Sequence, residues 1–303
     1  MTLELRWIVS TSASCLHAAA ALLAGAALVD KKISAALAGE VEGLGEDLAA
    51  AGLTPRLFFE HAIGLAARFD TPMKWAEVLV VKTLGPQATA ERITARLAQR
   101  LVALEAAFQQ ANPRALDELE LRGEPLREQW AARGPGLIAA LARLTTPDLI
   151  VSEADAILVQ PVLGGAGAAH ELYNSVSIEA VLANPIAELP EVLRLGWLLA
   201  QLNLDLPRYR EILTRDRPRA VGSLAMIPAV LAAAQEVELA QLDKATLATA
   251  LAAWHVESAE SEPLWEWWET YQATSVPWTV ALGALDRMLA AEPPDSAPRQ
   301  SNR

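Results

Sequence analysis

His170, Tyr173, Asn174 and Glu179 are the residues of this chain whose types and spacing could do chemistry. They follow a glycine-rich bend, in a stretch where most of the neighbouring sequence is apolar. If residues 168–183 form a helix, steps of three and four residues bring His170 and Asn174 onto one face, with Tyr173 at its edge. An imidazole, a phenol and an amide could then line the pocket of an enzyme, or of a small-molecule or metal binder.

The bend could let a ligand approach the backbone closely, because Gly164, Gly165 and Gly167 carry no side chain. The alternative interpretation is structural. In that case His170 and Asn174 satisfy backbone groups that glycine-rich turns leave open. Neither interpretation specifies a cofactor, so the sequence leaves the cofactor unknown.

Glu179 is expected on the opposite side of the same helix, along an apolar face. A carboxylate in that position is either paired with an arginine from another helix, such as Arg194, or held with a raised pKa for proton transfer. Structural pairing is the simpler of the two hypotheses.

Two motifs near the bend are incomplete. His170 and Glu171 match the start of the zinc-protease pattern HExxH, but Asn174 replaces the second histidine. Neutral amides bind zinc poorly, so no metal site is predicted. The glycines also lack the third small residue of a dinucleotide-binding fingerprint, and Pro161 would fit badly in the central strand that such a site requires.

A second candidate surface is aromatic and lies within residues 264–271. Their spacing places Trp267, Trp268 and Tyr271 on one broad side of a helix, opposite two glutamates, with Trp265 at the flank of that side. Aromatic side chains at this density are enriched at binding interfaces. The alternative is an internal anchor that fixes the C-terminal helices to the rest of the protein.

The charge distribution restricts the class of ligand. The formal net charge is −12, and no lysine or arginine occurs between Arg143 and Arg194. A phosphate or nucleic-acid ligand needs fixed positive charge where it docks, so nucleic acid is not an expected partner. A cationic ligand, a metal ion or a basic protein partner suits this segment better.

The composition favours helix throughout. Alanine and leucine dominate a chain that is 52% hydrophobic, and most segments between glycine and proline follow a 3.6-residue period. The clearest is 88–111. We therefore expect an all-α fold, a multi-helix orthogonal bundle or an irregular α-solenoid of roughly 13–15 helices. Its expected parts are an N-terminal helical subdomain at 1–145, an acidic C-terminal helical subdomain at 146–291 and a disordered tail at 292–303.

Residues 7–29 are the best candidate for a membrane span, but they are mostly alanine with several hydroxyl side chains, so a buried helix is favoured. A single cysteine, Cys15, allows no internal disulfide, which favours the cytoplasm. The function expected from these patterns is a helical protein-interaction or scaffold module. Its acidic, Trp-rich surface would bind a partner protein or a second copy of the chain. The alternative is the enzyme or small-molecule binder described above.

Overall fold

The computed structural model describes residues 3–69, 71–86, 90–213, 217–256, 261–274 and 276–291. Within these ranges the chain forms twelve α-helices and one four-stranded mixed sheet. The all-α expectation is therefore wrong, although helix remains the dominant structure. The predicted tail at 292–303 lies outside the described residues.

The strands are β1 (Glu4–Val9), β2 (Glu153–Val159), β3 (Gly167–His170) and β4 (Ser175–Glu179). The helices before β2 are α1 (Thr11–Leu23), α2 (Lys31–Ala51), α3 (Pro55–Ala66), α4 (Pro72–Leu84), α5 (Ala90–Ala111) and α6 (Ala115–Leu144), followed by the 3₁₀ turn η1 (Pro147–Leu149). A second 3₁₀ turn, η2 (Glu171–Tyr173), joins β3 to β4. The later helices are α7 (Glu191–Leu199), α8 (Pro207–Arg210), α9 (Pro218–Glu236), α10 (Lys244–Ala253), α11 (Ser261–Ala273) and α12 (Trp278–Ala291).

The sheet has the strand order β1-β2-β4-β3. β1, β2 and β4 run parallel, and β3 pairs antiparallel with β4 at the edge. β1 and β2 come from the two halves of the chain, so the predicted N- and C-terminal subdomains contribute to one sheet. The carboxyl ends of the three parallel strands meet at one edge of the sheet and their amino ends at the other. We call these the carboxyl edge and the amino edge.

Helix was wrongly expected at 168–183, which contains β3, η2 and β4, and the segment 7–29 begins within β1 before it forms α1. β2 is buried from its second residue onward because helices cover both faces of the sheet. A strand in that position is a continuous apolar run, which resembles a buried helix in sequence. Pro161 does not interrupt β2, because the strand ends two residues before it.

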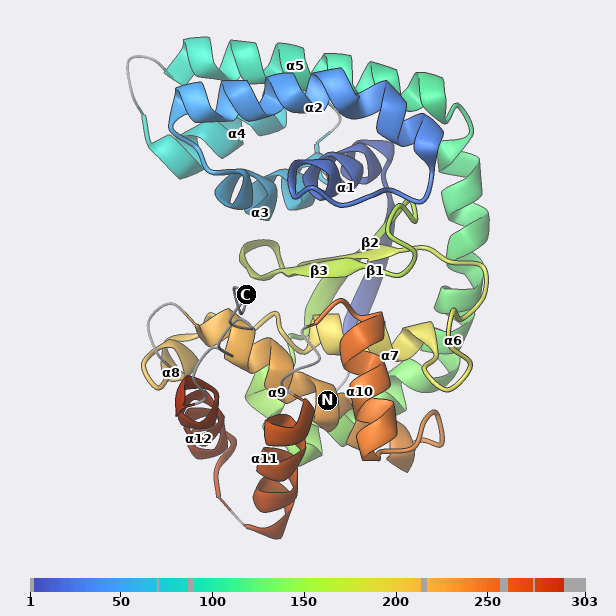
Figure 1. Cartoon of the computed structure of the whole chain (residues 1–303), viewed down its shortest axis with the longest axis vertical. Helices are drawn as coiled ribbons and strands as arrows, with labels where there is room; N and C mark the ends of the chain where they lie inside the picture. Colours follow the sequence, from blue (N-terminus) through green and yellow to red (C-terminus); the bar gives the residue numbers. More distant parts are fainter. Residues whose placement is uncertain are drawn as a thin grey trace, which may run out of the picture.

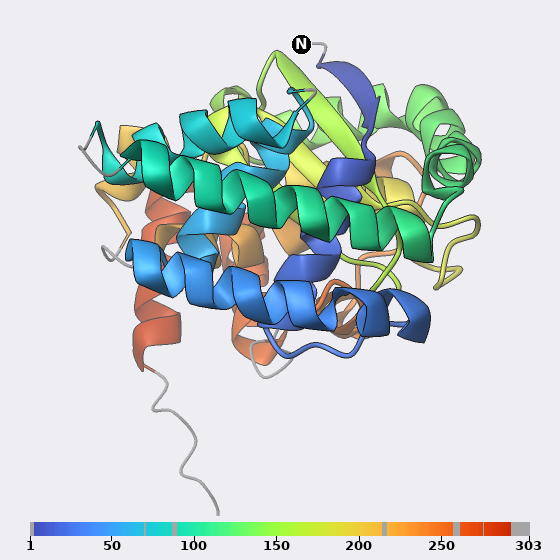
Figure 2. The same cartoon turned by 90° about the horizontal axis from the view of Figure 1, so that it is seen from above.

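Figure 1 shows the sheet between two helical layers, with α1–α5 on one side and α7 and α9–α12 on the other. Alternate residues of β2 serve the two layers: Ile157 and Val159 pack with α1, α3, α4 and α5, whereas Ala156 and Leu158 pack with α6, α7 and α9. α2 and α5 lie side by side across the outside of the first layer (Figure 2). Each layer thus buries one face of the same strands.

The helix predicted at 88–111 is confirmed as α5, whose buried side includes Leu97, Leu101 and Phe108. α1 begins after Ser10, whose hydroxyl accepts a hydrogen bond from the Ala13 N–H, and it ends at Leu23. Among the described residues, no helix is both long enough and apolar enough to cross a membrane.

Candidate functional site

One face of β4 carries a buried polar row directed at the α1 and α3 layer. Ser175, Ser177 and Glu179 alternate with Val176 and Ile178, and all five are fully buried. The alternation places the two apolar residues in the opposite core, with α6, α7 and α9. The polar row therefore sits where a core would ordinarily be apolar, and Ser177 and Glu179 both have hydrogen-bond partners there.

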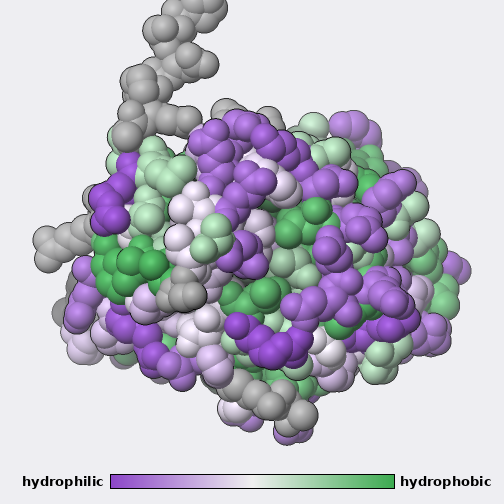
Figure 3. All heavy atoms as spheres, turned by 90° about the horizontal axis from the view of Figure 1, so that it is seen from below, coloured by the Kyte–Doolittle hydropathy of each residue, from purple (hydrophilic) through white to green (hydrophobic). Residues whose placement is uncertain are grey.

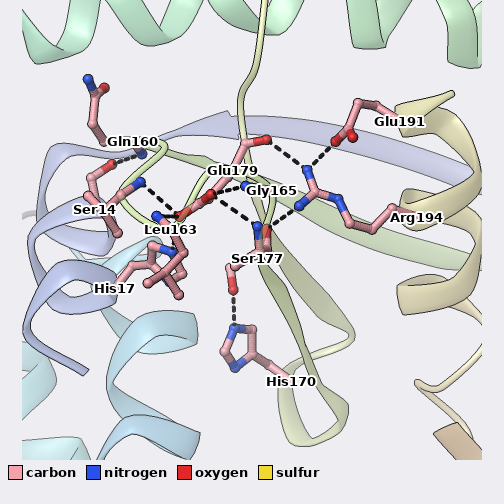
Figure 4. Close-up of polar contacts among 12 residues, drawn as sticks. Ser14, His17, Gln160, Leu163, Gly165, His170, Ser177, Glu179, Glu191 and Arg194 are labelled. Carbon is pink, nitrogen blue, oxygen red and sulfur yellow. Dashed lines mark hydrogen bonds and ion pairs between the residues drawn. The ribbon is translucent and has the colours of Figure 1, made fainter. Parts of the chain in front are cut away.

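Glu179 ends β4 at the carboxyl edge, and its carboxylate accepts five hydrogen bonds (Figure 4). His17 of α1 contributes one, with Nε2 2.9 Å from Oε1; since a carboxylate only accepts, this ring nitrogen carries the proton. The other four donors are backbone N–H groups of the loop that follows β2, at Val162, Leu163, Gly165 and Ala166, with distances of 2.6–3.0 Å.

These contacts set the ionisation of Glu179. Burial alone would raise its pKa, but the hydrogen bond and charge of His17 and the N–H groups of Ala166 and Gly165 lower the pKa to about 2. A proton-transfer role with a raised pKa, one of the two alternatives for this residue, does not fit that direction. Glu179 instead holds the loop against the end of its own strand.

The glycine bend is shaped by this carboxylate. Gly165 has φ of +136° and Gly164 has φ of +85°, which orient successive N–H groups inward. Inward N–H groups of this kind make a site for an anion, and here the anion is Glu179 itself. A phosphate group would have to displace a carboxylate of the same chain. Gly167 has a different role: a Cβ there would lie 2.6 Å from Leu198 of α7.

Arg194 of α7 fixes the same loop from the other side and is 1% exposed. Its guanidinium donates to the carbonyls of Ala166 at 3.0 Å and Glu179 at 3.2 Å, and to the carboxylate of Glu191. The predicted pairing of Arg194 with the Glu179 carboxylate is therefore wrong, because Arg194 contacts only the backbone oxygen of Glu179 and pairs with Glu191. Burial raises the pKa of Glu191, although Arg194 opposes the shift.

His170 ends β3 and is buried, with Nε2 3.0 Å from Ser177 Oγ. Burial, followed by the charges of Arg219 and His17, lowers its pKa to about 4, so the imidazole is neutral at pH 7. His170 and Glu179 bond to different partners (Figure 4). They do not form a shared catalytic pair.

Tyr173 and Asn174 lie at the amino edge. The Tyr173 hydroxyl is 2.6 Å from His61 Nδ1 of α3, and burial raises the Tyr173 pKa to about 12. Asn174 has φ of 42° and its carbonyl accepts a hydrogen bond from the Asp155 N–H at 2.9 Å. The expected four-residue cluster is therefore divided between the two edges, because β3, η2 and β4 form a hairpin in place of the expected helix and Glu179 ends its second strand.

A hollow of about 210 Å³ lies at the carboxyl edge, beside the glycine bend. It lies between the loop that follows β2 and the loop that follows β4, which are neighbouring parallel strands, and the end of α10 forms its third wall. Trp254 lines it while stacking on Trp197, with ring centroids 5.1 Å apart. The lining residues are Gly164, Gly165, Pro185, Ile186, Leu189, Glu191, Ala252, Ala253, Trp254 and His255.

The aromatic residues of α11 are mostly internal. Trp267 and Trp268 are 2% exposed, and Trp265 and Tyr271 are partly buried. Trp267 Nε1 donates to Ala281 O at 2.7 Å, and the Tyr271 hydroxyl donates to the carbonyl that ends α6 at 2.8 Å. This arrangement matches the anchor interpretation. Seen from the side of α11 and α12, hydrophilic groups surround several smaller apolar areas (Figure 3).

Binding of a partner protein stays a prediction. The buried indoles of Trp267 and Trp268 offer little exposed surface to such a partner. No group of three or more His, Cys, Asp or Glu side chains is placed to hold a metal ion in the described ranges.

Sequence reasoning missed His17, Glu191, Trp254 and His255 as neighbours of the bend. The alternating pattern Ser-Val-Ser-Ile-Glu at 175–179 was the available signal for β4.

No protein-family model matches the chain, and neither a curated protein nor a solved structure matches it.

Proposed function

We propose that the protein binds a small organic ligand at the carboxyl edge of its sheet. The hollow beside Gly164 and Gly165 carries this proposal. Ligands of open α/β sheets bind in the crevice outside the carboxyl ends of the strands, between the loops that follow neighbouring strands. The hollow occupies that place between the loops after β2 and β4.

The local construction supports a preformed site. Glu179 and Arg194 fix the loop that supplies one wall, and both are fully or almost fully buried. Buried groups with shifted pKa values are concentrated at functional sites, and Glu191, whose pKa is raised by burial, lines the hollow. A wall fixed in advance lowers the entropic cost of binding.

The lining favours a compact, planar ligand that is neutral or cationic. The volume of about 210 Å³ lies below the range of roughly 300–1,000 Å³ typical of drug-sized ligands. Trp254, Ile186 and Leu189 supply apolar contact. The lining includes the carboxylate of Glu191 and no lysine or arginine.

Three probes of one shape and different charge test the proposal: benzamidine, benzamide and benzoate. We expect saturation-transfer NMR to detect benzamidine most strongly and benzoate least. Ala252→Phe should fill the hollow and weaken benzamidine binding at least tenfold, because Ala252 is exposed in its lining. Ala245→Phe, at an exposed position near the other end of α10, is the matched control.

Equal binding of benzamidine to the Ala252→Phe and Ala245→Phe variants would contradict the site, as would no binding of any probe at millimolar concentration.

A cytoplasmic location belongs to the same proposal, since the one cysteine, Cys15, is buried and unpaired.

A further inference from the structure

A larger hollow, of about 590 Å³, lies at the amino edge of the sheet. It is far from the bend in the fold, because it opens where β1, β2 and β4 begin and not where they end. Its lining residues are Glu4, Arg6, Arg68, Glu153, Ala154, Asp155, Leu172, Tyr173 and Asn174. The volume is within the range of small-molecule sites.

Two arginines in this hollow are held by one buried carboxylate. Asp155 is 6% exposed. Its Oδ1 accepts from Arg6 Nε at 2.8 Å, and its Oδ2 accepts from Arg6 Nη2 at 2.9 Å and Arg68 Nη2 at 3.1 Å. Arg68 Nη2 also donates to the carbonyl of Tyr173. Both guanidinium groups are therefore oriented before any ligand arrives.

These arginines retain free donors. Among the described residues, Arg6 Nη1 and the Nε and Nη1 groups of Arg68 donate to no protein acceptor. The side chains are 68% and 38% exposed, respectively. A guanidinium fork with open N–H groups is suited to a carboxylate.

Two negatively charged side chains lie next to these arginines on β1 and β2. Glu4 and Glu153 are direct partners in the parallel register, and both are exposed. Like charges placed opposite each other destabilise a sheet. Neither carboxylate accepts a hydrogen bond from the described part of the chain. Each lies two residues before a member of the Arg6–Asp155 pair, on the same face of the sheet, so that the backbone positions are about 7 Å apart along the strands.

We infer that the amino-edge hollow binds a zwitterion, with its carboxylate on Arg6 and Arg68 and its ammonium group between Glu4 and Glu153. The spacing selects a molecule in which the two charges are several bonds apart, such as an ω-amino acid or a dipeptide. Leu172, which is 50% exposed, offers the connecting carbons an apolar contact.

A series of equal chain length tests this inference by isothermal titration calorimetry: 6-aminohexanoate, hexanoate and hexylamine. We expect 6-aminohexanoate to bind at least tenfold more tightly than either singly charged analogue. Glu153→Gln should reduce this preference over hexanoate at least threefold. It should not affect folding, because the Glu153 side chain is exposed and its carboxylate accepts no hydrogen bond from the described residues. Glu46→Gln, an exposed glutamate on α2, is the matched control.

Arg68→Gln should reduce the preference over hexylamine, with Arg133→Gln on α6 as its control. Equal binding of the three probes, or no binding of 6-aminohexanoate, would overturn the inference, as would an unchanged preference in Glu153→Gln. The Ala252→Phe variant blocks only the carboxyl-edge hollow, so it should bind 6-aminohexanoate normally whether or not the proposed function is correct.

Discussion

The two edges of the sheet use acidic side chains in opposite ways. At the carboxyl edge, Glu179 is fully buried and its carboxylate is saturated by His17 and four backbone N–H groups. At the amino edge, Glu4 and Glu153 are exposed, and no described residue donates a hydrogen bond to them. The first arrangement stabilises a loop within the chain. The second leaves hydrogen-bonding capacity for a molecule from outside.

The largest expected effect tests the carboxyl edge. Glu179→Gln keeps the size of the side chain but replaces one acceptor oxygen with an amide that faces backbone N–H groups. We expect the free energy of unfolding to fall by about 3 kcal/mol at pH 7, because buried N–H groups of the loop lose their charged acceptor. Urea unfolding measures it. Glu153→Gln should change stability by no more than about 0.5 kcal/mol. Similar losses in the two variants would remove the contrast.

The pH dependence of stability gives the next effect. The pKa of His170 is about 4 in the folded protein against an ordinary value of 6.5. Between these values the unfolded chain binds a proton that the folded chain does not. The contribution of neutral His170 to the free energy of unfolding is complete above pH 6.5. It is lost as the pH falls, by up to about 3 kcal/mol near pH 4. Glu179 stays ionised over this range because its pKa is about 2.

Urea unfolding at pH 7, 5.5 and 4.5 should therefore show a smaller loss of stability in His170→Gln than in the unmodified protein. His255→Asn is the control, because His255 is exposed and asparagine tolerates its positive φ. If the two variants lose stability equally with falling pH, His170 is not the group responsible.

The smallest effect is expected at the amino edge. Asp155→Asn removes the charge that holds Arg6 and Arg68, but both arginines are partly exposed and water can solvate them. We expect a loss of about 1–2 kcal/mol in urea unfolding, well below that of Glu179→Gln. A loss as large as that of Glu179→Gln would mean that Asp155 and its two arginines also stabilise the fold, so the two edges would no longer differ in this respect.

The helices could be predicted from sequence because their signals are local. Pro55 and Pro72 begin α3 and α4, and the apolar period of α5 is plain in its residues. The strands could not be predicted in the same way. Ala156 to Val159 is apolar at every position because helices cover both faces of β2, and only the strand partners distinguish it from a buried helix.

The predicted candidate site depended on whether residues 168–183 form a helix or strands. Glycine at 164 and 165 was identified as a special bend, and both residues do line the carboxyl-edge hollow. Treating 168–183 as a helix, however, united Glu179 with His170, Tyr173 and Asn174, whereas β4 runs the length of the sheet and carries Glu179 to the opposite edge. Trp254 and His255 come from a helix about 90 residues later in the chain, and no pattern in the sequence links them to the bend.

The parallel pairing of β1 with β2 has a consequence for how the chain is made. Arg6 and Asp155 are 149 residues apart. At roughly 5–20 residues per second, translation separates these two strands by about 7–30 s. During that time the five helices of the first layer can form through neighbouring contacts, but the sheet that covers their apolar side does not exist. Folding should therefore be slowed by this long-range contact, and nascent chains that stop before Glu153 should be the ones that aggregate or recruit chaperones.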